Sequence, residues 1–121
     1  KTLSVDTLID QPFIALNSRG PLGRALEDTL EAAAVHPDIV AWTETYHVAR
    51  ALVGAGVGVT IADEITARSA VGSNVAMYSL DPRVTFDIAL LQRGDASLSL
   101  AARRFVKLLG NAVREVLKVR A

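Results

Sequence analysis

The chain has 121 residues, which is enough for one compact domain with an apolar core and too few for two domains of ordinary size. Half of the residues are apolar, 21% are charged and 5% are aromatic, a composition typical of a folded aliphatic domain and not of a disordered or fibrous chain. Cysteine is absent, which excludes disulfides, thiolate metal ligands and cysteine nucleophiles and favours a cytoplasmic location. No apolar run approaches the roughly 20 residues that cross a bilayer, so we expect no contact with a membrane.

The formal net charge of zero conceals a split along the chain. Residues 1–95 hold 7 Lys/Arg and 12 Asp/Glu, whereas residues 96–121 hold 6 and 1. A basic tail can bind nucleic acid. Here the cations fall on the polar side of an amphipathic helix, for which a solvated face is the ordinary explanation, so we expect no DNA contact from this segment.

The first predicted strand is residues 12–16, a short apolar run between Pro12 and a turn-forming Asn-Ser-Arg-Gly segment. Residues 1–10 are expected to be a polar lead-in without an element that flanks this strand. A helix is predicted from Pro21 to His36-Pro37, followed by a strand over residues 38–43. Thr45 is expected to cap a second helix that ends at Gly56.

The remaining elements alternate in the same way. The predictions are a strand over 57–62, a short helix over 63–69, strands over 75–80 and 85–91, and a long helix from Ser97 or Ser99 to residue 119. The order of strands and helices, with strands too apolar to be half solvated, predicts an α/β fold in three layers, with a mostly parallel sheet flanked by helices.

Three features could indicate a nucleotide-binding, metal or catalytic site, but the sequence does not favour any of them. The glycines at 54, 56 and 58 lie between a helix and the strand after it, the reverse of the nucleotide-binding order, so we interpret them as a helix end and a tight turn. His36 and His47 are the only histidines, and neither has the partners of a metal site, so no metal or other cofactor is expected. No nucleophile lies beside a base, so no catalytic residue is predicted.

Two polar segments remain as candidate binding sites, because each follows the carboxyl end of a predicted strand and begins a helix. Such positions offer unpaired N–H groups to an anion or a carbonyl group. Plain helix capping is the alternative for both segments. The candidate residues are Asn17, Ser18, Thr43, Glu44, Thr45 and Tyr46.

Read together, five segments resemble the substrate-binding domain of LysR-type transcriptional regulators. The ordered set is more specific than any single member and extends over nearly the whole chain. It consists of residues 12–16 (PFIAL), 37–40 (PDIV), 51–59 (ALVGAGVGV), 80–82 (LDP) and 98–105 (LSLAARRF).

The resemblance implies a type II periplasmic-binding-protein-like domain, in which two α/β lobes hold a small-molecule effector between them. Residues 1–92 would form the second lobe, and residues 93–121 would be a long C-terminal helix returning to the first lobe. The rest of the first lobe and the DNA-binding helix-turn-helix would lie outside these residues, so the chain is expected to be a fragment that reaches DNA only through an N-terminal domain. The six candidate residues match positions at which the family contacts its effector.

The sequence departs from the family at two places. Glu44 puts a carboxylate where family members commonly hold an organic anion, which argues against an acidic effector. Residues 62–64 (ADE) stand where the family usually has a proline. The apolar stripe of the 97–119 helix is expected to be exposed, so we expect a homo-oligomer that forms through this helix.

Two other functions remain open at this point. A fragment of a solute-binding protein would have the same fold, and the residues upstream of Lys1 would separate it from a regulator. A small α/β enzyme that uses Glu44, Thr45 or His47 is the third hypothesis, which lacks a nucleophile and base in one place.

Overall fold

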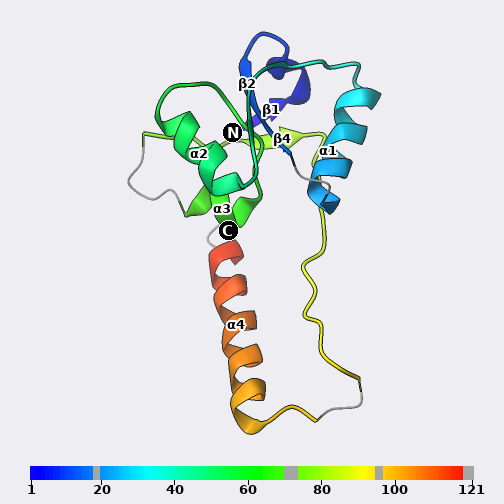
Figure 1. The fold of residues 1–121 in the computed structure, drawn as a ribbon, viewed down its shortest axis with the longest axis vertical. Coiled ribbons are helices and arrows are strands. Elements are labelled where there is room, and N and C mark those ends of the chain that lie inside the picture. Colours follow the sequence, from blue (N-terminus) through cyan, green and yellow to red (C-terminus); the bar gives the residue numbers. More distant parts are fainter. Residues whose placement is uncertain (18–19, 70–73, 95–96, 119–121) are drawn as a thin grey trace. The chain divides into compact units, whose positions relative to one another are not determined.

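The computed structural model of the chain describes residues 1–17, 20–69, 74–94 and 97–118. The chain divides into two compact units, residues 1–86 and residues 87–121. The first unit has the parallel strands and flanking helices of an α/β fold (Figure 1), as predicted. Its strands form two separate pairs, β1 with β4 and β2 with β3, where the sequence predicted a single sheet.

Strand β2 (Pro12–Leu16) is the centre of the first unit. It pairs in parallel with β3 (Asp38–Thr43) along one edge. On its other edge, the Ile14 N–H donates to the Val59 carbonyl at 2.8 Å, and the Val59 N–H donates to the Pro12 carbonyl at 2.8 Å. Both predicted strands are therefore confirmed.

The predicted strand over residues 57–62 is wrong in its extent, because only a single bridge joins Val59 to Phe13. The Ile14 carbonyl, which a continuing ladder would use, instead accepts a hydrogen bond from the Thr60 hydroxyl at 2.8 Å. A side-chain donor thus ends the pairing after one residue.

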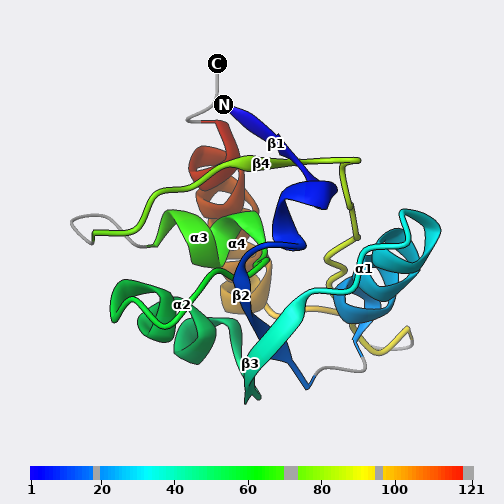
Figure 2. The same ribbon diagram turned by 90° about the horizontal axis from the view of Figure 1, so that it is seen from above.

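Helices α1 (Pro21–Ala32) and α2 (Tyr46–Gly54) lie on opposite sides of β2 and β3 in both ribbon views (Figures 1 and 2). Pro21 occupies the first turn of α1, as expected, since this position needs no N–H. Gly56, with φ of 79°, follows the end of α2 in the left-handed region, which glycine adopts without strain. The short helix α3 (Glu64–Arg68) begins after Asp63, whose carboxylate accepts from Thr66 N–H at 2.8 Å.

The first eight residues are not the unstructured lead-in that the sequence predicted. They form β1 (Thr2–Ser4) and the 3-10 helix η1 (Val5–Leu8), and β1 pairs in parallel with β4 (Ser79–Asp81). The prediction failed because the partner strand lies more than 70 residues away, and because only two apolar side chains anchor the segment. These two, Val5 and Leu8, are buried in one cluster with Phe13, Ala15 and Val35.

Two other strand predictions are wrong. Within residues 75–80 only the last two belong to a strand, since β4 spans Ser79–Asp81. Residues 85–91 form no strand, and Ile88, Leu90 and Leu91 are exposed. Alternating apolar residues need a sheet edge to pair with, and no described strand offers one to this segment.

The second unit contains α4 (Leu100–Lys118), which confirms the predicted long helix over its described residues. The Ser99 hydroxyl accepts from the Ala102 N–H at 3.1 Å and caps its first turn. Large apolar side chains of α4 are exposed, among them Leu100, Phe105, Leu108 and Leu109.

Gly58→Ala is expected to lower the free energy of unfolding by about 1–3 kcal/mol, because its Cβ would overlap the backbone carbonyl of Pro12. Gly54→Ala is the matched control, since its Cβ would lie 3.7 Å from Val75 Cγ2, an ordinary contact. Alanine also has a higher helix propensity at position 54, by about 1 kcal/mol. Urea unfolding followed by circular dichroism measures both variants, and equal midpoints would contradict the close approach of residue 58 to β2.

Candidate functional site

The carboxyl ends of β2 and β3 lie where the chain changes direction across the sheet. From β2 the chain passes through α1 to β3, and from β3 it passes through α2 to Val59, on the far edge of β2. Because β3 and Val59 lie on opposite edges of β2, the strand order reverses at β2, and α1 and α2 cover opposite sides of the strands. Open parallel sheets bind ligands at such a reversal, beyond the carboxyl ends of the strands.

Five of the six predicted residues gather there, and we call them the strand-end site. The Asn17 N–H donates to the Thr43 carbonyl at 2.8 Å, and the Asn17 side-chain amide donates to Glu44 Oε1 at 3.0 Å. These two bonds join segments that are 27 residues apart in sequence. The site consists of Asn17, Thr43, Glu44, Thr45 and Tyr46. Ser18, the sixth predicted residue, lies outside the described residues.

Two members of the strand-end site hold backbone in place. Thr43 is only 6% exposed, and its hydroxyl lies 3.4 Å from the carbonyl oxygens of Ala15 and Thr45. Thr45 caps α2, because its hydroxyl accepts from the Val48 N–H at 3.4 Å. The geometry thus gives both threonines a structural role, and their contact with a ligand stays a prediction.

The other members of the strand-end site are more accessible. Asn17 and Glu44 are exposed, and Tyr46 is half-buried in the first turn of α2. Burial raises the pKa of the Tyr46 hydroxyl, and the negative charge of Asp63 raises it further. The accessible part of the site thus holds the Glu44 carboxylate and a phenol that stays protonated at neutral pH, and the Asp63 carboxylate is near enough to act on that phenol. Among the described residues, no Lys or Arg forms an ion pair with either carboxylate.

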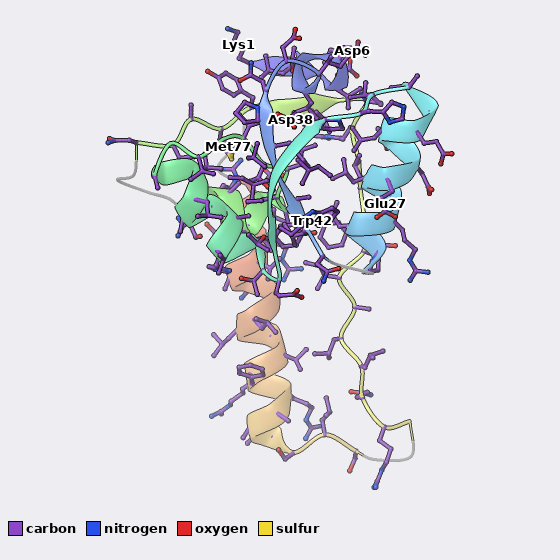
Figure 3. The ribbon with its side chains drawn as sticks, turned by 45° about the horizontal axis from the view of Figure 1, so that its top comes forward. Lys1, Asp6, Glu27, Asp38, Trp42 and Met77 are labelled. Atoms are coloured by element: carbon purple, nitrogen blue, oxygen red, sulfur yellow. The ribbon has the colours of Figure 1, made fainter. Side chains whose placement is uncertain are left out.

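A cavity of about 100 Å³ adjoins the strand-end site through Tyr46 and extends between β2, β3 and α1. Its lining includes Trp42, the only tryptophan of the chain, and Glu27 from α1. In Figure 3, Trp42 lies near the end of β3, on the side that faces the helix carrying Glu27. Neither residue was predicted from the sequence as part of a binding site. A lone tryptophan at the end of a predicted strand was the available signal, but its direction could not be read from the sequence.

A candidate metal site and a membrane-spanning helix are both absent from the described residues. They contain no group of three or more His, Asp or Glu side chains that could hold a metal ion. His36 and His47 are both exposed. No helix in the described part of the chain is long and apolar enough to cross a membrane.

Comparison with known proteins identifies the family. The family described as the LysR substrate binding domain matches residues 1–114. The HTH-type transcriptional regulator DgcR of Pseudoalteromonas sp. is 30% identical over 111 residues, which are 92% of this chain and 38% of the relative. The HTH-type transcriptional regulator AdmX of Serratia plymuthica is 32% identical over 118 residues, or 94% of this chain and 37% of the relative. No solved structure matches the chain.

The chain belongs to the LysR substrate-binding domain family, as its sequence resemblance indicated. It spans less than two fifths of the length of the curated relatives that it matches. Both relatives are named transcriptional regulators.

The raised pKa of Tyr46 predicts a pH dependence. Because the folded pKa lies above the usual value near 10, the free energy of unfolding is unaffected by this group below pH 10 and falls as the pH rises from 10 to the folded pKa. Asp63→Asn keeps a capping side chain but removes the charge, so it should lower the pKa of Tyr46.

Absorbance titration near 295 nm measures this pKa directly. A Tyr78→Phe background leaves Tyr46 as the only tyrosine, since the chain has two. Asp28→Asn is the control, because Asp28 is an exposed carboxylate of α1 that is not among the causes of the shift. An unchanged Tyr46 titration in Asp63→Asn would contradict the electrostatic contribution of Asp63.

Proposed function

We propose that the chain is the effector-binding part of a LysR-type transcriptional regulator, with the strand-end site as its contact to a small molecule. The observation that carries the proposal is the pair of hydrogen bonds from Asn17 to Thr43 and Glu44, which joins the ends of β2 and β3 at the reversal point of a LysR substrate-binding domain. A ligand bound there touches two segments at once. It can therefore favour one arrangement of the domain over another through its difference in affinity.

The proposal includes the wider architecture. Residues 1–92 would form the second lobe of a type II periplasmic-binding-protein-like domain, and residues 93–121 would return to the first lobe. The parallel strands with helices on both sides support this arrangement. The effector would lie between the lobes, a separate N-terminal domain would bind DNA, and the regulator would act in the cytoplasm. The names of both relatives favour a regulator over a solute-binding protein or an enzyme.

Replacing Glu44 and Thr45 together by alanine is expected to abolish the effector response of a full-length regulator that carries this domain. The double variant removes a carboxylate acceptor from the site and the hydroxyl that caps α2, while DNA affinity should stay within about twofold of the parent, since the substitutions lie outside any DNA-binding segment. Reporter transcription measures the response, and gel-shift titration measures DNA affinity.

Asp38→Ala is the matched control, because it removes an exposed carboxylate from the opposite end of β3. Its effector response should equal that of the parent. A double variant that responds normally would overturn the proposed site. Loss of DNA affinity together with the response would show that the substitutions damaged the whole protein and would count against a local sensing role.

We also propose that the 121-residue chain by itself forms a homo-oligomer through α4, the helix whose apolar side the first lobe would cover in a full-length regulator. The support is the exposed apolar side of this helix, where Phe105, Leu108 and Leu109 are 62%, 67% and 43% exposed. Apolar patches of this kind are rarely left in contact with water, and a second copy of the chain can cover them.

Leu108→Glu should weaken self-association about tenfold or more, because a charge would replace a side chain at the centre of the apolar stripe. Arg103→Ala makes the same change in net charge on the roughly opposite side of the helix and should leave association unchanged. Sedimentation velocity at high micromolar concentration measures both variants. A strictly monomeric parent chain under these conditions would overturn the proposal.

A further inference from the structure

The cavity beside the strand-end site has an apolar floor and an acidic, aromatic mouth. Phe13 and Ala15 of β2 are buried and line its floor. Trp42, which is 64% exposed, and Glu27, which is also exposed, line the part that meets solvent. Tyr46 lines the same cavity from the first turn of α2. We call this the aromatic cavity.

A β-bulge explains why Trp42 lies here. Phe13 pairs with Ile39, but after the irregularity Ala15 pairs with Trp42, so that Val40 is the additional residue of β3. Paired residues of neighbouring strands point to the same side of a sheet. Trp42 therefore shares the side of Phe13 and Ala15, which is the side on which Leu30 of α1 packs.

The lining is suited to an organic cation. It includes the only tryptophan, one of the two tyrosines and one of the three phenylalanines of the chain. Their ring faces attract a cation that has shed its water, most strongly in the case of tryptophan. Among the described residues of the lining, Glu27 is the one charged side chain, and none is Lys, Arg or His. At these residues an anion would meet a carboxylate and aromatic rings without a compensating positive charge.

The geometry points to the aromatic cavity as the binding site of a small alkylammonium ion, with the alkyl groups against Phe13 and the charge between Trp42 and Glu27. The volume of about 100 Å³ sets the size of the ligand, since a cavity of about 150 Å³ accepts benzene. A trimethylammonium group is close to a benzene ring in volume, so its methyl groups would enter the cavity only in part, and the rest would lie at the mouth beside Trp42. Longer substituents of the amine would extend past Trp42 into solvent.

This inference deepens the proposed function, on which it rests in one respect: the alkylammonium ion is the effector only if the chain is a sensor. The cavity and the strand-end site share Tyr46, so one molecule can reach both. The acidic character of the strand-end site, where Glu44 accepts only from Asn17 among the described residues, agrees with a cationic ligand.

Choline, its uncharged isostere 3,3-dimethylbutan-1-ol and the anion 3,3-dimethylbutanoate form a matched set of probes. Trp42 is the only tryptophan, so its fluorescence reports binding at the mouth of the cavity without labelling. With the 121-residue chain, choline should change the emission in a saturable way. Its affinity should exceed that of the isostere about threefold or more, and the carboxylate should bind more weakly than either.

Two substitutions test the site itself. Glu27→Gln keeps the shape but removes the charge, so it should erase most of the preference for choline over the isostere. Glu31→Gln, on the same helix but outside the cavity lining, is the control and should retain the preference. Leu26→Phe should fill the cavity and abolish binding of both compounds, with circular dichroism to confirm the fold.

The inference is upheld if choline is preferred and the preference depends on Glu27. It is overturned if the isostere or the carboxylate binds as well as choline, if no probe changes the emission, or if Glu31→Gln has the same effect as Glu27→Gln. A reporter assay separates the two proposals. Binding of choline without a transcriptional response upholds the cavity and overturns the alkylammonium ion as the effector. A response to carboxylates alone upholds sensing and overturns the ammonium site.

Discussion

The first unit depends on hydrogen bonding along both edges of one short strand, β2. Its five residues pair with β3 on one side and with Val59 on the other, and the second contact requires the backbone of Gly58 to lie against Pro12. Because all three segments run parallel, their carboxyl ends meet at one edge, and α1, α2 and α3 begin there. The strand-end site is thus a consequence of the pairing of β2, and Thr43, Thr45 and Asp63 hold the helix starts in position.

The irregular register within that pairing gives the domain its second feature. In a regular register Val40 would pair with Ile14 and Trp42 with Leu16, so strand alternation would turn Trp42 toward α2, away from Glu27. The bulge instead places an exposed tryptophan on the α1 side of the sheet, next to an acidic residue and above buried Phe13. A local change in backbone register therefore decides whether the cavity has an aromatic mouth.

The sequence predicted those features that depend on neighbouring residues. The strands over 12–16 and 38–43 and the caps at Thr45 and Ser99 have local signals, and all are confirmed. The contact of Asn17 with Glu44 was predictable only by the rule that parallel strands end together. The pairing of β1 with β4 and the lack of a strand partner for residues 85–91 depend on which strand edges are available elsewhere in the fold. A local sequence pattern could therefore not predict either feature. The aromatic cavity depends on register, and periodicity does not reveal a bulge.

An alkylammonium ligand in the aromatic cavity would contact three elements at once: Glu27 on α1, Trp42 on β3 and Tyr46 on α2. These elements carry the chain into and out of the strand-end site, so any difference in their spacing between two states of the domain changes the affinity of the cavity. By thermodynamic linkage, the ligand in turn stabilises the state of the domain in which the cavity binds it with higher affinity. The charge of Glu27 would give the ligand its specificity, because a neutral molecule of equal shape makes the same apolar contacts with Phe13 and Ala15 but lacks the ionic one. Specificity for the sign of the charge and coupling to the strand ends would thus arise from the same few residues.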